Sequence, residues 1–244
     1  MSWEHIKGNV EAVQRRIAAA AQRAGRRAEE ITLIAVSKTH PAAAIRAAYD
    51  AGVRHFGENR VQEWEGKRGG AADLAAAWHL IGHLQSNKAA RAAKVFDCVD
   101  SVDDWALAQR LDRGRAESGA AKKLRVLIEV RVAQEETKSG VESSDVVVLA
   151  KKVAALSQLD LAGLMCIPPF LENIEEVRLY FQKLRKLRDE LQAKLGLPLP
   201  VLSMGMYSSW HFENLKLTSS SGRASPPWEL PPGRTEEIKT SVNL

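Results

Sequence analysis

Short apolar runs alternate with helical patterns along most of the chain, and this alternation restricts the fold more than any other feature. The run from Ile31 to Val36 is followed by Lys38 and by a helical pattern that starts at Pro41. The same order recurs, and the apolar runs predict strands at 31–36, 55–57, 78–82, 95–99, 124–132, 159–167 and 199–202. Strands and helices in this order form parallel β/α units, either in a barrel or in a doubly wound sheet.

Apolar residues at helical spacing predict the helices between these strands. The two longest patterns cover 3–25 and 174–195, and each is followed by a glycine that favours a helix end, Gly25 and Gly196. Shorter helices are expected at 41–52, around Trp64, and at 88–93, 103–115 and 144–156.

Composition places the chain among globular proteins. Its 244 residues are 45% hydrophobic and 27% charged. No apolar run approaches the roughly 20 residues that span a bilayer, and residues 1–5 lack the pattern of a signal peptide, so we expect no membrane association. The two cysteines, Cys98 and Cys166, lie far apart without CxxC spacing. This usage is typical of a reducing compartment, and we expect a cytoplasmic protein.

The net charge of +5 raises the question of a nucleic-acid partner. Basic residues such as Arg23, Arg26 and Arg27 stand beside Glu29 and Glu30 in and after a predicted helix. This pattern indicates a solvated helix face, so we expect no nucleic-acid partner. The excess of positive charge suits a small anionic ligand.

Lys38 is the first candidate for chemistry. It follows a buried strand at the carboxyl end, where β/α folds place their sites. Partial burial lowers the pKa of a lysine and makes the neutral amine available to attack a carbonyl carbon. An ordinary solvated loop lysine is the competing interpretation.

Three further segments follow strands at the same end and carry glycines beside polar side chains. Glycine lets backbone N–H groups approach an anion closely, and the Asn, His, Gln and Ser side chains add hydrogen bonds. The segments are 57–60 (GENR), 82–85 (GHLQ) and 203–206 (SMGM).

The sequence also argues against a zinc site, a glycine-rich phosphate-binding loop and a GxSxG serine nucleophile. His79 and His83 have the spacing of a zinc-binding helix, but they lie on or next to a predicted strand and lack the glutamate of that motif, so we expect no metal site. The chain contains neither a GxGxxG nor a GxxxxGK[ST] phosphate-binding motif, and no GxSxG nucleophile motif.

Seven segments extend these motifs along the chain: 35–39 (AVSKT), 56–63 (FGENRVQE), 78–88 (WHLIGHLQSNK), 99–102 (VDSV), 138–140 (KSG), 163–165 (GLM) and 203–206 (SMGM). In content and in order they closely resemble the YggS/PROSC family of pyridoxal phosphate homeostasis proteins. The resemblance covers roughly residues 3–206.

The resemblance implies an α/β fold, a (β/α)8 TIM barrel of the alanine racemase N-terminal domain type, that binds pyridoxal 5′-phosphate (PLP). By its place in the motif, Lys38 corresponds to the lysine that holds the cofactor as a Schiff base, the internal aldimine. Asn59 and His83 correspond to loop positions that line the cofactor, and Ser203 and Gly205 to the loop beside its phosphate. The family implies a monomer that buffers PLP or delivers it to PLP-dependent apoenzymes, with no established catalysis.

The chain departs from the family after Met206. The family continues with a serine, a helix and a final strand carrying an Arg-Ile-Gly-Ser/Thr motif, whereas this chain has Tyr207 followed by a segment rich in serine and proline. We therefore expect a PLP-binding barrel over 1–206 and an irregular tail over 207–244 in place of the last helix and strand. The eighth strand would be missing, and the first and seventh strands would keep unpaired edges.

The same features favour a carrier over an enzyme. Racemisation on PLP needs a second acid or base opposite the lysine, which racemases take from another domain, and the barrel pattern occupies nearly all of this chain. Two alternatives stay open: a PLP-dependent enzyme, such as an amino-acid racemase, that uses Lys38 with an unidentified base, and a variant whose altered tail impairs PLP binding by removing donors to the phosphate.

Overall fold

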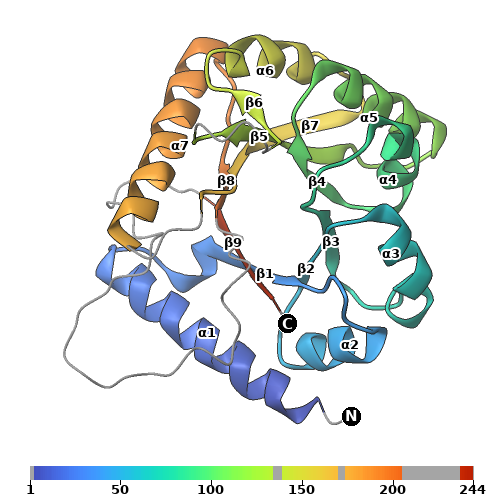
Figure 1. Ribbon diagram of the computed structural model, residues 1–244, viewed down its shortest axis with the longest axis vertical. Helices are drawn as coiled ribbons and strands as arrows, with labels where there is room; N and C mark the ends of the chain where they lie inside the picture. The colour runs from blue at the N-terminus through green and yellow to red at the C-terminus, as the bar shows by residue number, and fades with distance from the viewer. Residues whose placement is uncertain (1–2, 134–138, 170–173, 205–236, 244) are drawn as a thin grey trace.

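Eight parallel strands form a closed ring, which Figure 1 shows end-on. The computed structural model describes residues 3–133, 139–169, 174–204 and 237–243. Around the ring, the strands follow the chain order, and each pairs with the next. They are β1 (Ile31–Val36), β2 (His55–Glu58), β3 (Ala77–Leu80), β4 (Cys98–Val102), β5 (Leu124–Arg131), β7 (Leu159–Cys166), β8 (Val201–Met204) and β9 (Glu237–Asn243). A two-residue strand, β6 (Val141–Glu142), pairs with the end of β5.

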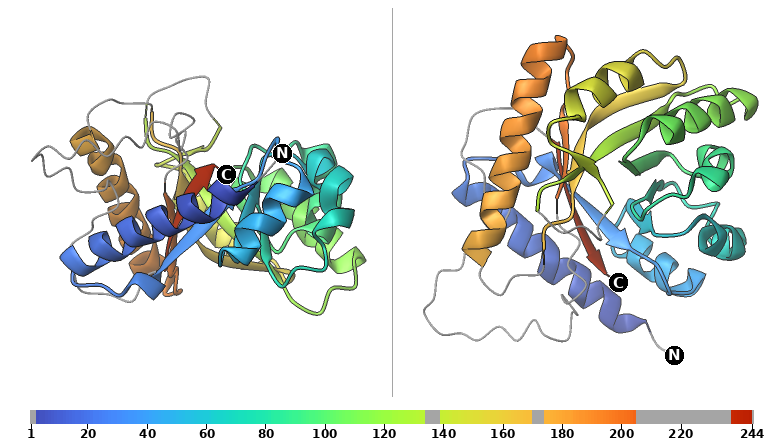
Figure 2. Two further views of the ribbon diagram at one scale, coloured as in Figure 1. Left: turned by 90° about the horizontal axis from the view of Figure 1, so that it is seen from below. Right: turned by 45° about the horizontal axis from the view of Figure 1, so that its top comes forward.

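Helices surround the ring on its outer side (Figures 1 and 2). They are α1 (Glu4–Arg23), α2 (Ala42–Asp50), α3 (Val61–Lys67), α4 (Ala89–Val95), α5 (Trp105–Glu117), α6 (Val146–Ala154) and α7 (Ile174–Leu195), with 3₁₀ turns η1 (Ala28–Glu30), η2 (Arg68–Gly70) and η3 (Ser86–Lys88). The predicted (β/α)8 barrel fold is confirmed. Among the described residues, no helix has both the length and the apolar character needed to cross a membrane.

The closing strand β9 corrects one prediction. It lies between β1 and β8, parallel to both, with Ile238 opposite Ile31 on one side and Leu202 on the other. The expectation of a missing eighth strand, with unpaired edges on the first and seventh strands, is therefore wrong. The segment alternates Ile238, Thr240 and Val242 with polar residues, which is a strand pattern without the family's arginine-glycine motif. The rest of the expected tail, 207–236 and 244, lies outside the described residues, so the boundary at 206 stays a prediction.

The fourth strand also differs from its predicted position. The sequence predicts it at 95–99, but Val95 ends α4, and β4 runs from Cys98 to Val102. The preceding apolar residues belong to the helix, and Phe96 packs into the core just after it. The seventh predicted strand is displaced in the same direction, to Val201–Met204.

Two layers of side chains fill the structure. Between strands and helices lies the main apolar core, where Trp78 of β3 stacks on Trp64 of α3 with ring centroids 3.8 Å apart. A smaller apolar cluster of Leu127, Ala162, Met165 and Val201 packs separately from this layer. Because successive strand residues face opposite sides, the residues between those of the outer core point into the ring. Several of these are polar, and they build the site described next.

Candidate functional site

Four of the five predicted site residues lie at the carboxyl end of the barrel. Lys38 follows β1, Asn59 follows β2, His83 follows β3 and Ser203 lies within β8. Since all strands of the ring are parallel, these ends share one rim. Lys38 and Asn59 are half-buried, Ser203 is buried and His83 is exposed. Gly205, the fifth residue, lies outside the described residues.

The loop that carries Lys38 is held by an ammonium group from α3. Lys67 Nζ donates to the carbonyl oxygen of Ser37 at 2.6 Å and to that of His40 at 3.3 Å. The N–H of Thr39 donates to Glu63 Oε1, and Thr39 has a φ of 65°, a left-handed conformation that is uncommon for a residue other than glycine. The residues on both sides of Lys38 are therefore fixed by one helix.

A buried carboxylate lies beneath this loop. Glu58, at the end of β2, has no exposed surface; its Oε1 lies 2.8 Å from Lys67 Nζ and accepts a hydrogen bond from Ser37 Oγ. Burial raises the pKa of the Glu58 carboxyl, and the hydrogen bonds from Lys67 and Ser37 oppose that shift. Sequence reasoning missed Lys67 and Glu63 as parts of the site. Their spacing of four residues on one helix is the only local signal.

Asn59 stands where two rim loops pack closely. Its Oδ1 is buried and has no hydrogen-bond partner among the described residues. Next to it, a Cβ added to Gly82 would come within 2.6 Å of the Asn59 carbonyl oxygen, and Ser101 Oγ donates to the Gly82 carbonyl at 2.7 Å. A buried acceptor without a donor costs free energy, which a ligand with a hydrogen-bond donor would recover.

His83 lies on the outer part of the rim. Its side chain is 57% exposed, and Nδ1 lies 3.3 Å from Asp103 Oδ2. Burial raises the pKa of the Asp103 carboxyl, while the nearby His83 opposes that shift. Asp103 thus lies within reach of one nitrogen of an otherwise exposed His83 ring.

Ser203 joins a chain of polar groups inside the ring. Its Oγ lies 3.5 Å from Asp100 Oδ2, Asp100 Oδ1 lies 3.4 Å from His79 Nδ1, and His79 Nε2 lies 3.0 Å from His55 Nδ1. With Cys98, the His79 and Asp100 side chains bring potential metal-ligand atoms within 4.8 Å of one another. Both ring nitrogens of His79 are already hydrogen-bonded, so this geometry is accounted for by hydrogen bonds. The expectation of no metal site stays a prediction.

The comparison with protein families identifies this architecture. The model of the alanine racemase N-terminal domain matches residues 9–214, most of the chain. The chain belongs to the alanine racemase N-terminal domain family. The expected fold type is thereby confirmed from sequence as well as from structure.

Relatives align with this chain over most of their own length. The chain is 43% identical over 194 residues to a pyridoxal phosphate homeostasis protein of Aquifex aeolicus, covering 80% of this chain and 84% of the relative. It is 44% identical over 201 residues to a protein of the same name from Pseudomonas aeruginosa, covering 82% and 85%. The predicted resemblance to this group of proteins is confirmed.

Solved structures of other proteins share the fold of this chain. PipY of Synechococcus elongatus, solved with PLP bound, is 38% identical, with a TM-score of 0.72 that covers 92% of this chain and 97% of PipY. An alanine racemase of Clostridium difficile shares the fold at 14% identity, with a TM-score of 0.66, covering 81% of this chain and 50% of the racemase.

Proposed function

We propose that this protein binds PLP through Lys38 and helps to control the intracellular supply of the cofactor. The observation that carries the proposal is the placement of Lys38 at the barrel rim, on a loop that Lys67 and Glu63 fix from both sides. A relative of the same fold and 38% identity, PipY, has been solved with PLP bound, and several relatives are named for PLP homeostasis.

The residues of the rim fit the chemistry of this cofactor. PLP supplies an aldehyde that bonds covalently to amines and a ring that withdraws electrons. Lys38 would provide the amine, and the half-buried rim limits competition from water. Asn59 Oδ1, a buried acceptor without a partner among the described residues, would take a donor from the ligand. Ser203 is buried near the same rim, and its hydroxyl would exchange its contact with Asp100 for one with an anionic group of the ligand.

We propose a carrier rather than an enzyme as the main function. The support is the name of the relatives, which describes homeostasis and no reaction. The second candidate, a PLP-dependent enzyme, is favoured by the shared fold with alanine racemase, whose chain is only half covered by the match. Turnover of an amino acid by the PLP-loaded protein would distinguish the two.

We also propose that the protein is a cytoplasmic monomer that passes PLP to apoenzymes. Both cysteines, Cys98 and Cys166, are buried free thiols, which agrees with a reducing compartment. Size-exclusion chromatography with light scattering would test the monomer, and transfer of PLP to an added apoenzyme would test delivery.

A spectroscopic titration tests the central claim. Adding PLP to the purified protein should produce the absorbance band of PLP bonded to a lysine amine, and borohydride reduction followed by peptide mass spectrometry should place the label on Lys38. Lys38→Ala should abolish the band, whereas Lys151→Ala, on the exposed face of α6, should keep it. A band that persists in Lys38→Ala would overturn the assignment. A band that forms only at high PLP concentration would favour the alternative of impaired binding.

A further inference from the structure

A groove lies on the outer side of the barrel, between α7 and the end of β5. It consists of two adjoining hollows, with volumes of about 500 and about 250 Å³, which share Val132, Ser143 and Lys183. The larger hollow falls within the range of roughly 300–1,000 Å³ that ligand sites occupy. The residues that line this α7 groove differ from those assigned to the cofactor, so the groove is a surface distinct from the Lys38 loop.

One stripe of α7 forms the long wall of the α7 groove. Its members recur at helical spacing, and they are Tyr180, Lys183, Leu187 and Glu190. At 1.5 Å per residue, this stripe is about 15 Å long. An extended peptide covers that distance with about five residues, since a strand rises about 3.3 Å per residue. The length of the groove therefore suits a segment of another protein better than a small molecule.

Two lysines give the groove a positive charge without counter-ions. The Lys183 and Lys186 side chains are exposed, and neither forms an ion pair with a described residue. Lys183 Nζ lies 5.3 Å from the centroid of the Tyr180 ring, a cation–π contact that neutralises no charge. Neighbouring cations of this kind create a positive potential that attracts anionic groups.

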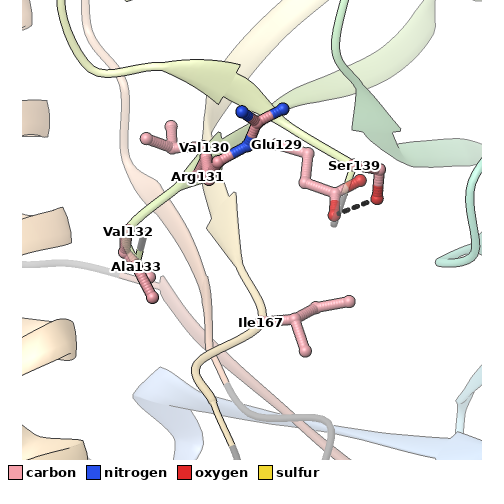
Figure 3. Close-up of a pocket in the computed structure, with 7 residues that line it drawn as sticks. All are labelled: Glu129, Val130, Arg131, Val132, Ala133, Ser139 and Ile167. Carbon is pink, nitrogen blue, oxygen red and sulfur yellow. Dashed lines mark hydrogen bonds between the residues drawn. The ribbon is translucent and has the colours of Figure 1, made fainter. Parts of the chain in front are cut away.

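Arg131 adds a guanidinium on the opposite wall. Figure 3 shows it at the end of β5, near Glu129, whose Oε1 accepts a hydrogen bond from Ser139 Oγ at 2.9 Å instead. Arg131 Nη1 donates to Glu142 Oε1 at 2.6 Å, whereas its Nε is buried and has no acceptor among the described residues. A buried donor without an acceptor costs free energy, which a carboxylate of a bound partner would recover. Glu142 is thus already paired, and the other acid of the lining, Glu190, lies at the far end of the stripe.

We propose that the α7 groove docks an acidic segment of a PLP-accepting apoenzyme, with carboxylates on Lys183, Lys186 and Arg131. Aliphatic residues between the carboxylates would pack on Val132 and Leu187, in the apolar part of the lining. The groove opens beside the carboxyl-end rim, because β5 ends there and α7 begins there after β7. A docked partner would therefore lie next to the mouth of the barrel. The inference rests on the proposed function, of which it names the partner.

Synthetic peptides test the groove by fluorescence anisotropy. The probe is a labelled Glu-Leu-Glu-Leu-Glu peptide; one matched peptide has glutamine for each glutamate, and another has serine for each leucine. The probe should bind, and each of the other two should bind at least about fivefold more weakly, because they lose the ion pairs or the apolar contacts. Equal binding of all three peptides, or binding of none, would overturn the proposal.

Variants locate the bound peptide. Lys183→Gln combined with Lys186→Gln should weaken binding of the acidic peptide at least about fivefold. The matched control combines Lys94→Gln with Lys123→Gln, two exposed lysines away from α7, and should bind as the wild type does. Equal losses in the two double variants would show that the peptide responds only to net charge, and would contradict docking in the groove. Melting curves followed by circular dichroism check that each variant is folded.

Transfer of PLP separates this inference from the proposed function. A PLP-depleted aminotransferase serves as the acceptor, and its recovered activity measures the rate of transfer. The Lys183 and Lys186 double variant should keep the absorbance band of the PLP adduct and slow the transfer at least about threefold, whereas the control double variant should transfer at the wild-type rate. Equal rates in the two variants would overturn the assignment of the partner. A failed PLP titration with intact binding of the acidic peptide would contradict only the proposed function.

Discussion

Lys67 Nζ donates to the carbonyl oxygen of Ser37 at 2.6 Å, which ties α3 to the residue just before Lys38. The same ammonium lies 2.8 Å from the buried Glu58 Oε1 and 3.2 Å from Glu63 Oε1. A single ammonium group thus pairs with two carboxylates and also holds the Lys38 loop. This relationship yields a prediction for both stability and cofactor binding.

Lys67→Met should destabilise the fold by about 3 kcal/mol, because it leaves the Glu58 carboxylate buried without its cation. It should also weaken PLP binding, since the Lys38 loop loses its contacts at Ser37 and His40. Urea unfolding and the PLP absorbance titration measure the two effects. Lys67→Arg should retain part of the stability and part of the PLP affinity. Adding Glu58→Gln to Lys67→Met should recover stability but not PLP affinity. Recovery of both would mean that Lys67 acts only by neutralising Glu58.

Gly82→Ala should destabilise the fold by about 2 kcal/mol, because the new Cβ would lie 2.6 Å from the Asn59 carbonyl oxygen and 2.9 Å from its Cα. These are backbone atoms, so the overlap can be relieved only by a shift of the main chain. The PLP titration should shift to weaker binding as well, since Asn59 would be displaced. Thermal melting and the titration provide the measurements.

Gly66→Ala is the matched control for that substitution. Gly66 lies within α3, and an added Cβ there would meet nothing within 4 Å. The change should therefore stabilise the protein, by up to about 1 kcal/mol, through helix propensity. Similar losses in both variants would indicate a general sensitivity to glycine replacement and contradict the close packing at Asn59.

The pattern of apolar residues was sufficient to predict most of the barrel. β1, β5 and β7 are buried, and their apolar runs could be located within one residue of their observed ends. β9 is hard to predict because its β-branched residues alternate with polar ones and because it lacks the family's arginine-glycine motif. A run such as Ile238 to Val242 is a weak signal when many serines and prolines precede it.

The candidate site was predictable only where residues follow strands. Lys38, Asn59 and His83 could be placed because the carboxyl ends of parallel strands meet at one rim. The bond from Lys67 to Ser37 joins residues 30 apart in sequence, and no local pattern reports such a contact. Glu129 had a signal that went unused: it is a carboxylate in the middle of an apolar run predicted as a buried strand.

Glu129→Gln should make the protein more stable at neutral pH than the wild type, by about 1 kcal/mol. Burial raises the pKa of Glu129 above its usual 4.5 in the folded state, with the nearby Asp103 adding to the shift. Glu129 therefore contributes its full stabilisation of the fold below its pKa in the unfolded chain. This stabilisation is lost as pH rises through its pKa in the folded state.

Since glutamine does not titrate, the advantage of Glu129→Gln should grow with rising pH and vanish near pH 4. Urea unfolding at several pH values measures the difference, with Glu117→Gln as the control that should show no such trend. A difference that is constant with pH would contradict the titration of Glu129.

A proline within β9 should open the ring that this strand closes. Thr240 lies opposite Leu33 of β1 and Met204 of β8, in the middle of the strand. Thr240→Pro removes a backbone donor from this position and should destabilise the protein by about 3 kcal/mol or more, while Thr240→Val should preserve the strand. The opened ring would expose the edges of β1 and β8, so light scattering should detect self-association of the proline variant. A proline variant that melts like the wild type and stays dispersed would show that β9 does not close the barrel in solution.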